Sequence, residues 1–169
     1  MNCGAGIDAS AMRRLEKKFP STKAKYDRVA FRAVAWELMV GYAGKKPDLE
    51  VAIDGGSPFP SLSVMVGRTD PYTFYKEHGL RMTPEASLDS GLDVLSVRKL
   101  NRRNIPRIAW QVLGSARHVH GRDIDYFHDA SQVVVTSPDP FPVQVDGDPL
   151  GDHRRLQIDI AREALWVVA

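Results

Sequence analysis

The stretch that decides the fold is Phe141-Pro142-Val143-Gln144-Val145-Asp146-Gly147-Asp148-Pro149-Leu150-Gly151. Valines alternate with polar residues over 143–146, which is the period-two pattern of a half-buried strand. Asp146-Gly147 is a tight-turn dipeptide, and the alternation resumes over 155–160. These residues predict a β-hairpin with two carboxylates, Asp146 and Asp148, at its tip. Taken locally, the pair is open to two interpretations: an ordinary Asp-Gly turn or a functional site.

Short strands are predicted on both sides of this hairpin. With its own two strands, the predicted set covers residues 49–54, 62–67, 92–97, 124–127, 132–136, 143–145, 155–160 and 165–168. About eight short strands, with turns between many of them, favour an antiparallel sandwich over a doubly wound sheet. The predicted fold class is therefore mainly β (α+β): an antiparallel β-sandwich with two to three added helices.

The helices are predicted from capping residues and from apolar spacing. The first begins at Asp8 or Ser10 and stops at Pro20. The second has an apolar face over 26–40 and stops at Gly44. Apolar side chains lie on several sides of the second helix, so we expect core burial, with a membrane-surface helix as the alternative. The third covers 105–116, with inward positions that include Trp110.

A long segment, residues 68–91, shows no clear periodicity between two predicted strands. A loop of that length in a compact domain is more often functional than idle. We therefore expect this segment to face a ligand.

The composition is typical of one soluble globular domain, because 43% of the 169 residues are hydrophobic and 26% are charged. The formal net charge of +2 is too small to indicate a nucleic-acid partner. The densest basic run extends from Arg98 to Arg103 and is followed by Arg107. We interpret it as a solvated loop or helix start, with binding of anionic lipid headgroups or phosphate as the alternative.

Cysteine usage and the absence of targeting patterns bear on location. Cys3 is the only cysteine, so an intrachain disulfide is excluded and a reducing cytoplasm is expected. The first residues lack a secretory signal, and no apolar run approaches the ~18 residues of a membrane span. Because the chain starts directly in a Gly-rich segment, we expect it to be part of a longer protein.

Local motifs give no nucleotide site and no simple catalytic centre. The chain contains neither a Gly-x-x-x-x-Gly-Lys-Ser/Thr loop nor a Gly-x-Gly-x-x-Gly turn, and it has no Gly-x-Ser-x-Gly elbow. His118, His120 and His128 suggest a metal, but they lack a standard zinc spacing, so we expect surface histidines.

Four segments, in order, resemble the C-terminal domain of the diacylglycerol kinase and sphingosine kinase superfamily, the bacterial lipid kinases. Residues 2–9, Asn-Cys-Gly-Ala-Gly-Ile-Asp-Ala, resemble that family's Asn-x-x-Gly-x-Gly-Phe-Asp-Ala segment. Residues 80–94 resemble its Pro-x-Ala-x-x-x-Asp-Gly-Leu-Leu-Asp-Val segment, and residues 97–121 the helix and Arg-His turn that follow. Residues 142–149 resemble Pro-x-x-x-Asp-Gly-Glu-Pro.

The resemblance implies one half of a two-domain enzyme. In the family, an N-terminal α/β domain with a Gly-Gly-Asp-Gly-Thr motif holds ATP, and the C-terminal sandwich contributes lipid contacts and part of the cleft. This sequence contains no such motif. We therefore expect residues 1–169 to be a single substrate-side domain, with ATP and Mg²⁺ held by a separate N-terminal half and with little kinase activity from this chain alone.

The resemblance also implies roles for individual residues. Asp146 matches the proposed general base for the lipid hydroxyl, and Asp148 a second carboxylate that is usually Glu. Asp8 matches a position that contacts the polar head of the lipid. A structural magnesium in some members binds an Asp that is replaced here by Ser90, with Asp89 beside it as the candidate ligand.

The expected partners are a lipid substrate, the N-terminal half and the inner face of the membrane as a peripheral contact; nucleic acid is not expected. Two alternatives stay open. One is a non-catalytic lipid- or partner-binding sandwich module. The other is an NAD kinase-like protein, which is disfavoured because the Gly-rich loop of those proteins is not found here. The sequence does not distinguish diacylglycerol from a sphingoid base.

Overall fold

The computed structural model describes residues 1–18, 27–75 and 77–161, and these form ten strands and five helical segments. The strands are β1 (Asn2–Ala5), β2 (Leu49–Ile53), β3 (Phe59–Ser61), β4 (Ser63–Gly67), β5 (Thr73–Tyr75), β6 (His78–Leu80), β7 (Leu92–Val97), β8 (Ile124–Ala130), β9 (Gln132–Val145) and β10 (Asp148–Asp159). The helices are α1 (Ile7–Lys18), α2 (Asp27–Trp36), the π-helix η1 (Glu37–Tyr42), α3 (Ile105–Leu113) and the 3₁₀-helix η2 (Arg117–His120).

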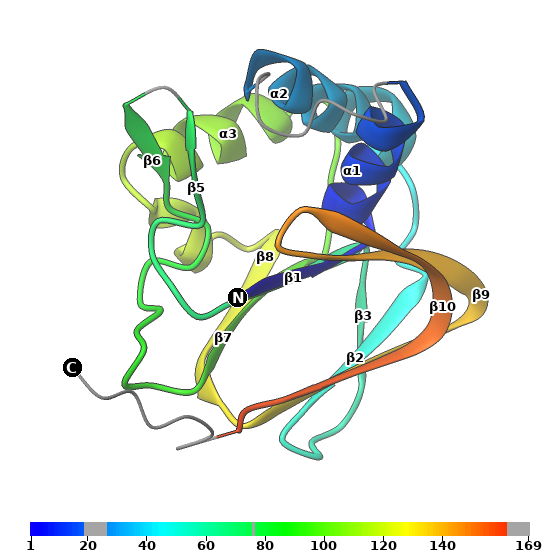
Figure 1. Ribbon diagram of the computed structural model, residues 1–169, viewed down its shortest axis with the longest axis vertical. Coiled ribbons are helices and arrows are strands. Elements are labelled where there is room, and N and C mark those ends of the chain that lie inside the picture. The colour runs from blue at the N-terminus through cyan, green and yellow to red at the C-terminus, as the bar shows by residue number, and fades with distance from the viewer. Residues whose placement is uncertain (19–26, 76, 162–169) are drawn as a thin grey trace.

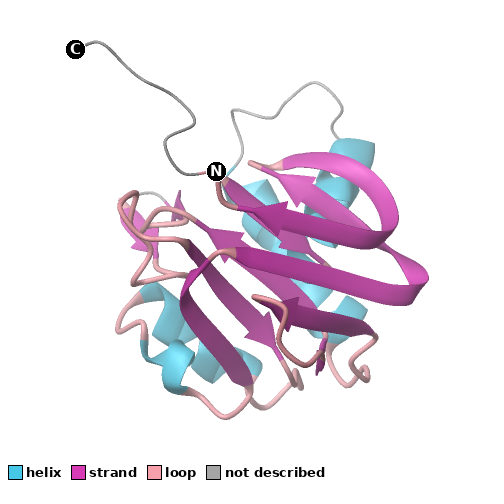
Figure 2. Ribbon diagram, turned by 90° about the horizontal axis from the view of Figure 1, so that it is seen from below, coloured by secondary structure: helices cyan, strands magenta, loops and turns pink. Residues whose placement is uncertain are grey.

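Eight strands form one curved sheet in the order β3-β2-β9-β1-β4-β7-β8, with β10 paired to β9. β5 and β6 form a separate hairpin, and the helices gather on one side of the strands (Figures 1 and 2). Every strand pair is antiparallel. The predicted fold class, an antiparallel β-rich sandwich with added helices, is confirmed.

The largest apolar core lies within the curve of the sheet. Alternate residues of neighbouring strands fill it, such as Val64 and Val66 of β4 and Val133 and Val135 of β9. Burying each such side chain contributes about 1.5–3 kcal/mol. On the other face of β4 and β7, Met65 and Leu95 form a smaller cluster, against which Tyr72, Met82 and Ile108 pack. The centre of the sheet is therefore covered on both faces.

The predicted hairpin is present but its strands are longer than predicted. Residues 132–136 and 143–145 belong to one strand, β9, which pairs with β2 over its first part and with β1 over its last. Pro138 and Pro140 fall between those two ladders, where their missing N–H groups cost no bond to either strand. The β9–β10 register also shifts nearby, between His153 and Arg155.

The helix predictions are confirmed in position and partly wrong in burial. The second helix divides into α2 and η1, and Trp36 at their junction is 50% exposed, although burial was predicted. α3 ends at Leu113 rather than at residue 116, and Trp110 is 79% exposed instead of inward. The buried face of α3 is already formed by Ile105, Ile108 and Val112. Trp110 lies on the opposite face of the helix. None of the helices among the described residues is long and apolar enough to cross a membrane.

The segment 68–91 contains the β5–β6 hairpin and is thus not wholly irregular. The predicted strand at 165–168 and the helix stop at Pro20 lie outside the described residues.

Candidate functional site

The tip of the β9–β10 hairpin is fixed against the first strand. Asp146 and Gly147 both adopt positive φ, 48° and 85°, as a tight hairpin turn requires. The Asn2 backbone N–H donates to Asp146 Oδ1 at 2.7 Å, and the Asp146 N–H donates to the Asn2 carbonyl at 2.8 Å. Asp146 is nevertheless exposed, so the structure presents an anchored carboxylate to solvent.

A polar cluster lies directly below this tip, composed of Gln144, Asp8 and Tyr72. The Gln144 amide Nε2 donates to Asp8 Oδ2 at 2.5 Å and lies 3.0 Å from the Tyr72 hydroxyl. That hydroxyl donates to the same Asp8 oxygen at 2.7 Å. On its other side, Gln144 Oε1 accepts the Gly147 N–H at 2.7 Å. Gln144 therefore joins Asp8 to the turn that carries Asp146.

Three segments far apart in sequence contribute to the cluster. Asp8 is in the first turn of α1, Tyr72 comes from the 68–91 segment, and Gln144 is in β9 opposite Gly4 of β1. A Cβ at Gly4 would lie 2.6 Å from Asp8 Oδ2 and 2.9 Å from Gln144 Nε2. Glycine at this position is thus needed for the close approach of the two side chains.

Burial determines the electrostatics of the cluster. Burial raises the pKa of Asp8 above its usual value, and the hydrogen bonds from Tyr72 and Gln144 partly oppose that rise. Burial and the neighbouring Asp8 raise the pKa of the Tyr72 hydroxyl, which stays a hydrogen-bond donor. Burial, then the charges of Asp8 and Asp146, raise the pKa of the Cys3 thiol to about 11. Cys3, whose side chain packs in the main apolar core, is therefore a protonated thiol and not a nucleophile.

The other predicted site residues lie at different distances from this centre. Asp148 is exposed at the start of β10, where it pairs in register with Val145. Asp89 is exposed in the turn before β7, where its N–H donates to Ser87 Oγ at 3.2 Å. The structure thus brings Asp8 and Asp146 together through Gln144 and leaves Asp89 in another region.

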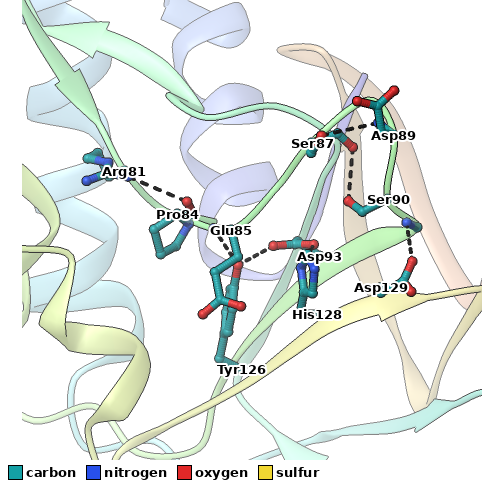
Figure 3. A network of polar contacts seen from close by, with 11 residues as sticks. Arg81, Pro84, Glu85, Ser87, Asp89, Ser90, Asp93, Tyr126, His128 and Asp129 are labelled. Carbon is teal, nitrogen blue, oxygen red and sulfur yellow. Dashed lines mark hydrogen bonds and ion pairs between the residues drawn. The ribbon is translucent and has the colours of Figure 1, made fainter.

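A second polar network lies beside that turn (Figure 3). Asp93 is fully buried and accepts hydrogen bonds from the Tyr126 hydroxyl and from His128 Nδ1, the latter at 2.8 Å. The Glu85 N–H donates to the Tyr126 oxygen at 3.1 Å. In Figure 3 the Asp89 carboxylate points away from Asp93 and His128. Within the described ranges, no group of three or more His, Cys, Asp or Glu residues is arranged to hold a metal ion.

The prediction that the three histidines are at the surface is wrong for His118. This residue is fully buried, and its Nε2 lies 3.1 Å from the Met82 carbonyl oxygen. Burial lowers the pKa of His118, so the ring is neutral. His128 is paired with Asp93, and His120 is exposed.

Sequence reasoning missed Tyr72, Gln144 and Asp93. Gln144 occupies the polar position of an alternating strand and was therefore expected to face solvent, but it is 1% exposed because α1 packs on that face of β9. Tyr72 has no local pattern, and only the expectation that 68–91 faces a ligand pointed to its segment. Asp93 stands in an alternating strand, so its burial could not be foreseen.

A family model matches residues 2–169, and its description is the YegS C-terminal NAD kinase beta sandwich-like domain. A resemblance to NAD kinases was disfavoured from the sequence because their Gly-rich loop is missing. The description of the family nevertheless compares its β-sandwich with that of NAD kinases. No curated protein sequence matches this chain.

Solved structures support the same fold. The chain superposes on three proteins from Bacillus anthracis str. Sterne assigned as diacylglycerol kinases, with TM-scores of 0.55, 0.50 and 0.50. Their identities to this chain are 16%, 12% and 17%, over 94%, 92% and 94% of it. The match covers 48%, 44% and 50% of those proteins, so this chain spans about half of their length. Because the family model covers nearly every residue, the chain belongs to the family of YegS C-terminal NAD kinase beta sandwich-like domains.

Proposed function

We propose that this chain is the substrate-side domain of an ATP-dependent lipid kinase that phosphorylates the hydroxyl of a diacylglycerol or a sphingoid base. The observation that carries the proposal is the exposed Asp146 carboxylate, held at the hairpin tip by Asn2 and joined through Gln144 to the partly buried Asp8. The family and the diacylglycerol kinase fold of the solved relatives support it.

Asp146 has the properties that a general base for a lipid alcohol needs. Its carboxylate is accessible, and its position is fixed by two hydrogen bonds to Asn2. In the proposed step, the hydroxyl proton passes to Asp146 while the hydroxyl oxygen bonds to the γ-phosphorus of ATP and ADP leaves. Fixed placement of the nucleophile is the main contribution a protein makes to such a transfer.

Asp8 is suited to hold the polar head of the lipid near that base. It is partly buried beside Tyr72 and the buried Gln144, which both donate to its Oδ2. A network of this kind fixes a carboxylate in one orientation. Asp148, one residue beyond Gly147, would support the base from the other side of the turn.

We place ATP binding and Mg²⁺ in a separate N-terminal half. The sequence has no Gly-Gly-Asp-Gly-Thr motif, and the described residues contain no cluster suited to a metal ion. We therefore derive no step through Mg²⁺. The role of Asp89 as a metal ligand stays a prediction.

The experiment is a phosphoryl-transfer assay with labelled ATP and dispersed diacylglycerol or sphingosine. The chain alone is expected to show little turnover, and the chain joined to the N-terminal half of a Bacillus anthracis relative is expected to phosphorylate lipid. Asp146→Asn should then lose roughly 10²–10⁴-fold in kcat with lipid affinity retained. Asp139→Asn, an exposed aspartate elsewhere in β9, is the matched control.

Three results would count against the proposal. Ordinary enzyme turnover by the chain alone would contradict the division of roles between two halves. Equal turnover of Asp146→Asn and Asp139→Asn in the joined protein would show that Asp146 is not the general base. Lipid binding by the chain without any turnover in the joined protein would favour the non-catalytic module.

A further inference from the structure

Helix α3 is apolar on two sides, and only one of them is buried. Ile105, Ile108 and Val112 pack into the domain. On the outer side, Pro106, Trp110 and Leu113 follow one another at i, i+4 and i+7, so they form one stripe along the helix. Trp110 is 79% exposed and Leu113 is 43% exposed. We call Pro106, Trp110 and Leu113 the outer stripe.

The chain around the outer stripe is basic and contains no acidic residue. Residues 94–122 include seven Lys and Arg residues and no Asp or Glu, although the chain as a whole has 23 basic and 21 acidic residues. Arg98 and Arg107 form ion pairs with Asp125 and Asp123 of the next strand and turn. Arg102 and Arg103 are exposed in the turn that leads into α3. Cations therefore border the outer stripe at the start of the helix.

We propose that the outer stripe of α3, with Arg102 and Arg103, docks the domain on an anionic lipid bilayer. A Trp beside aliphatic residues on one helix face, flanked by Arg, is the pattern of a helix that lies in the membrane interface. The cations match the negative surface of the bilayer, and the stripe matches its acyl boundary. A second copy of the chain is a poorer partner, because it would place two basic surfaces against each other. A nucleic acid is also a poorer partner, because its phosphates would lie against the apolar outer stripe.

The docking surface is connected to the candidate site. The Arg81 N–H donates to the Val112 carbonyl at 3.3 Å, which ties α3 to the residue after β6. The same hairpin is bonded to Tyr72, whose N–H donates to the Leu80 carbonyl at 2.9 Å. Helices α1, α2 and α3 lie at one end of the molecule (Figure 1). A bilayer at α3 therefore lies next to the segment that carries Tyr72.

The test is flotation of the isolated chain with vesicles of phosphatidylcholine alone or mixed with phosphatidylglycerol. The chain should bind the mixed vesicles and bind less as salt is raised, because the charges are exposed. Each Arg near an anionic surface contributes roughly fivefold in affinity, so Arg102→Gln/Arg103→Gln should bind about 25-fold more weakly. Lys46→Gln/Arg155→Gln removes the same charge from exposed positions elsewhere and should bind as the native chain does.

The apolar part has its own variants. Trp110→Gln/Leu113→Gln should lose vesicle binding, whereas Leu88→Gln/Leu150→Gln, two exposed leucines elsewhere, should retain it. In a chain with Trp36→Phe and Trp166→Phe, the emission of Trp110 should shift to the blue on mixed vesicles. This spectroscopic readout leaves α3 intact, so it does not depend on how the double variant folds.

Several outcomes would overturn the proposal. They are no binding to mixed vesicles, equal loss in the control pairs, or unchanged Trp110 emission on bound vesicles. Self-association or duplex binding that depends on α3, without vesicle binding, would assign the surface to another partner. None of these measurements uses ATP or a lipid substrate, so docking and the proposed kinase function can fail separately.

Discussion

Gln144→Met is the change that most sharply perturbs the cluster under the hairpin tip. Methionine keeps the length of the side chain but removes the donors to Asp8 and Tyr72 and the acceptor for the Gly147 N–H. Gln144 is almost fully buried, so water does not readily replace these partners. The variant therefore isolates the hydrogen bonds from the shape of the side chain.

The loss can be sized from the three contacts. A bond to a charged group contributes about 1.5–3 kcal/mol and each neutral bond about 0.5–1.5 kcal/mol. Since coupled bonds do not add fully, we expect the free energy of unfolding to fall by roughly 3–5 kcal/mol. For a domain of this size that lowers Tm by about 10 °C.

The assay is urea unfolding followed by circular dichroism, with Gln157→Met as the control. Gln157 is exposed on β10, so its replacement should change the free energy of unfolding by about 0.5 kcal/mol or less. Gln144→Glu adds a second carboxyl beside Asp8, so it should cost more stability at pH 7 than at pH 4. A Gln144→Met variant as stable as Gln157→Met, or a Gln144→Glu cost independent of pH, would refute the reasoning.

Three further predictions concern the same region. Burial raises the pKa of Asp8, so the native chain should lose stability as pH rises from 3.8, the usual value, through the higher folded-state value. Asp8→Asn should lack this loss in urea titrations, and parallel pH curves would contradict it. Gly4→Ala should lower the free energy of unfolding by about 1–3 kcal/mol in thermal melts, because its Cβ would lie 2.6 Å from Asp8 Oδ2. Gly114→Ala, whose Cβ would have its nearest atom at 3.5 Å, should lower it less. Equal losses of stability in the two variants would contradict this explanation. Cys3, with a buried thiol whose pKa is raised to about 11, should react with iodoacetamide at pH 8 only after unfolding; rapid labelling of the native chain would be the opposite result.

The sequence predicted the parts of the fold that depend on local periodicity. The β9–β10 hairpin, strand β7 over residues 92–97 and helix α1 lie where alternation, helical spacing and capping placed them. Residues 132–136 and 143–145 were predicted as two strands, but β9 continues through Pro138 and Pro140 because neither the β2 nor the β1 ladder needs their N–H groups. Trp110 was assigned to the core by its hydrophobicity, although three other residues of α3 already fill the buried face.

The candidate site was predictable only in part. The turn chemistry of Asp146-Gly147 indicated a projecting carboxylate, and the resemblance indicated Asp8. Neither could show that Gln144 connects them, because α1 covers a strand face that alternation assigns to solvent. Tyr72 reaches the site through the 68–91 segment, and contacts between segments so far apart in sequence leave no local pattern.

The most direct measurement is an amide NMR titration of the isolated chain with a short-chain diacylglycerol. We predict that the largest shifts fall on Asn2, Asp146 and Gly147 and on the amides beside Asp8 and Tyr72. Asp8→Asn should weaken the binding while the hairpin turn stays folded. Saturable binding with shifts confined to other parts of the chain, or no binding at all, would contradict a lipid site at the hairpin tip.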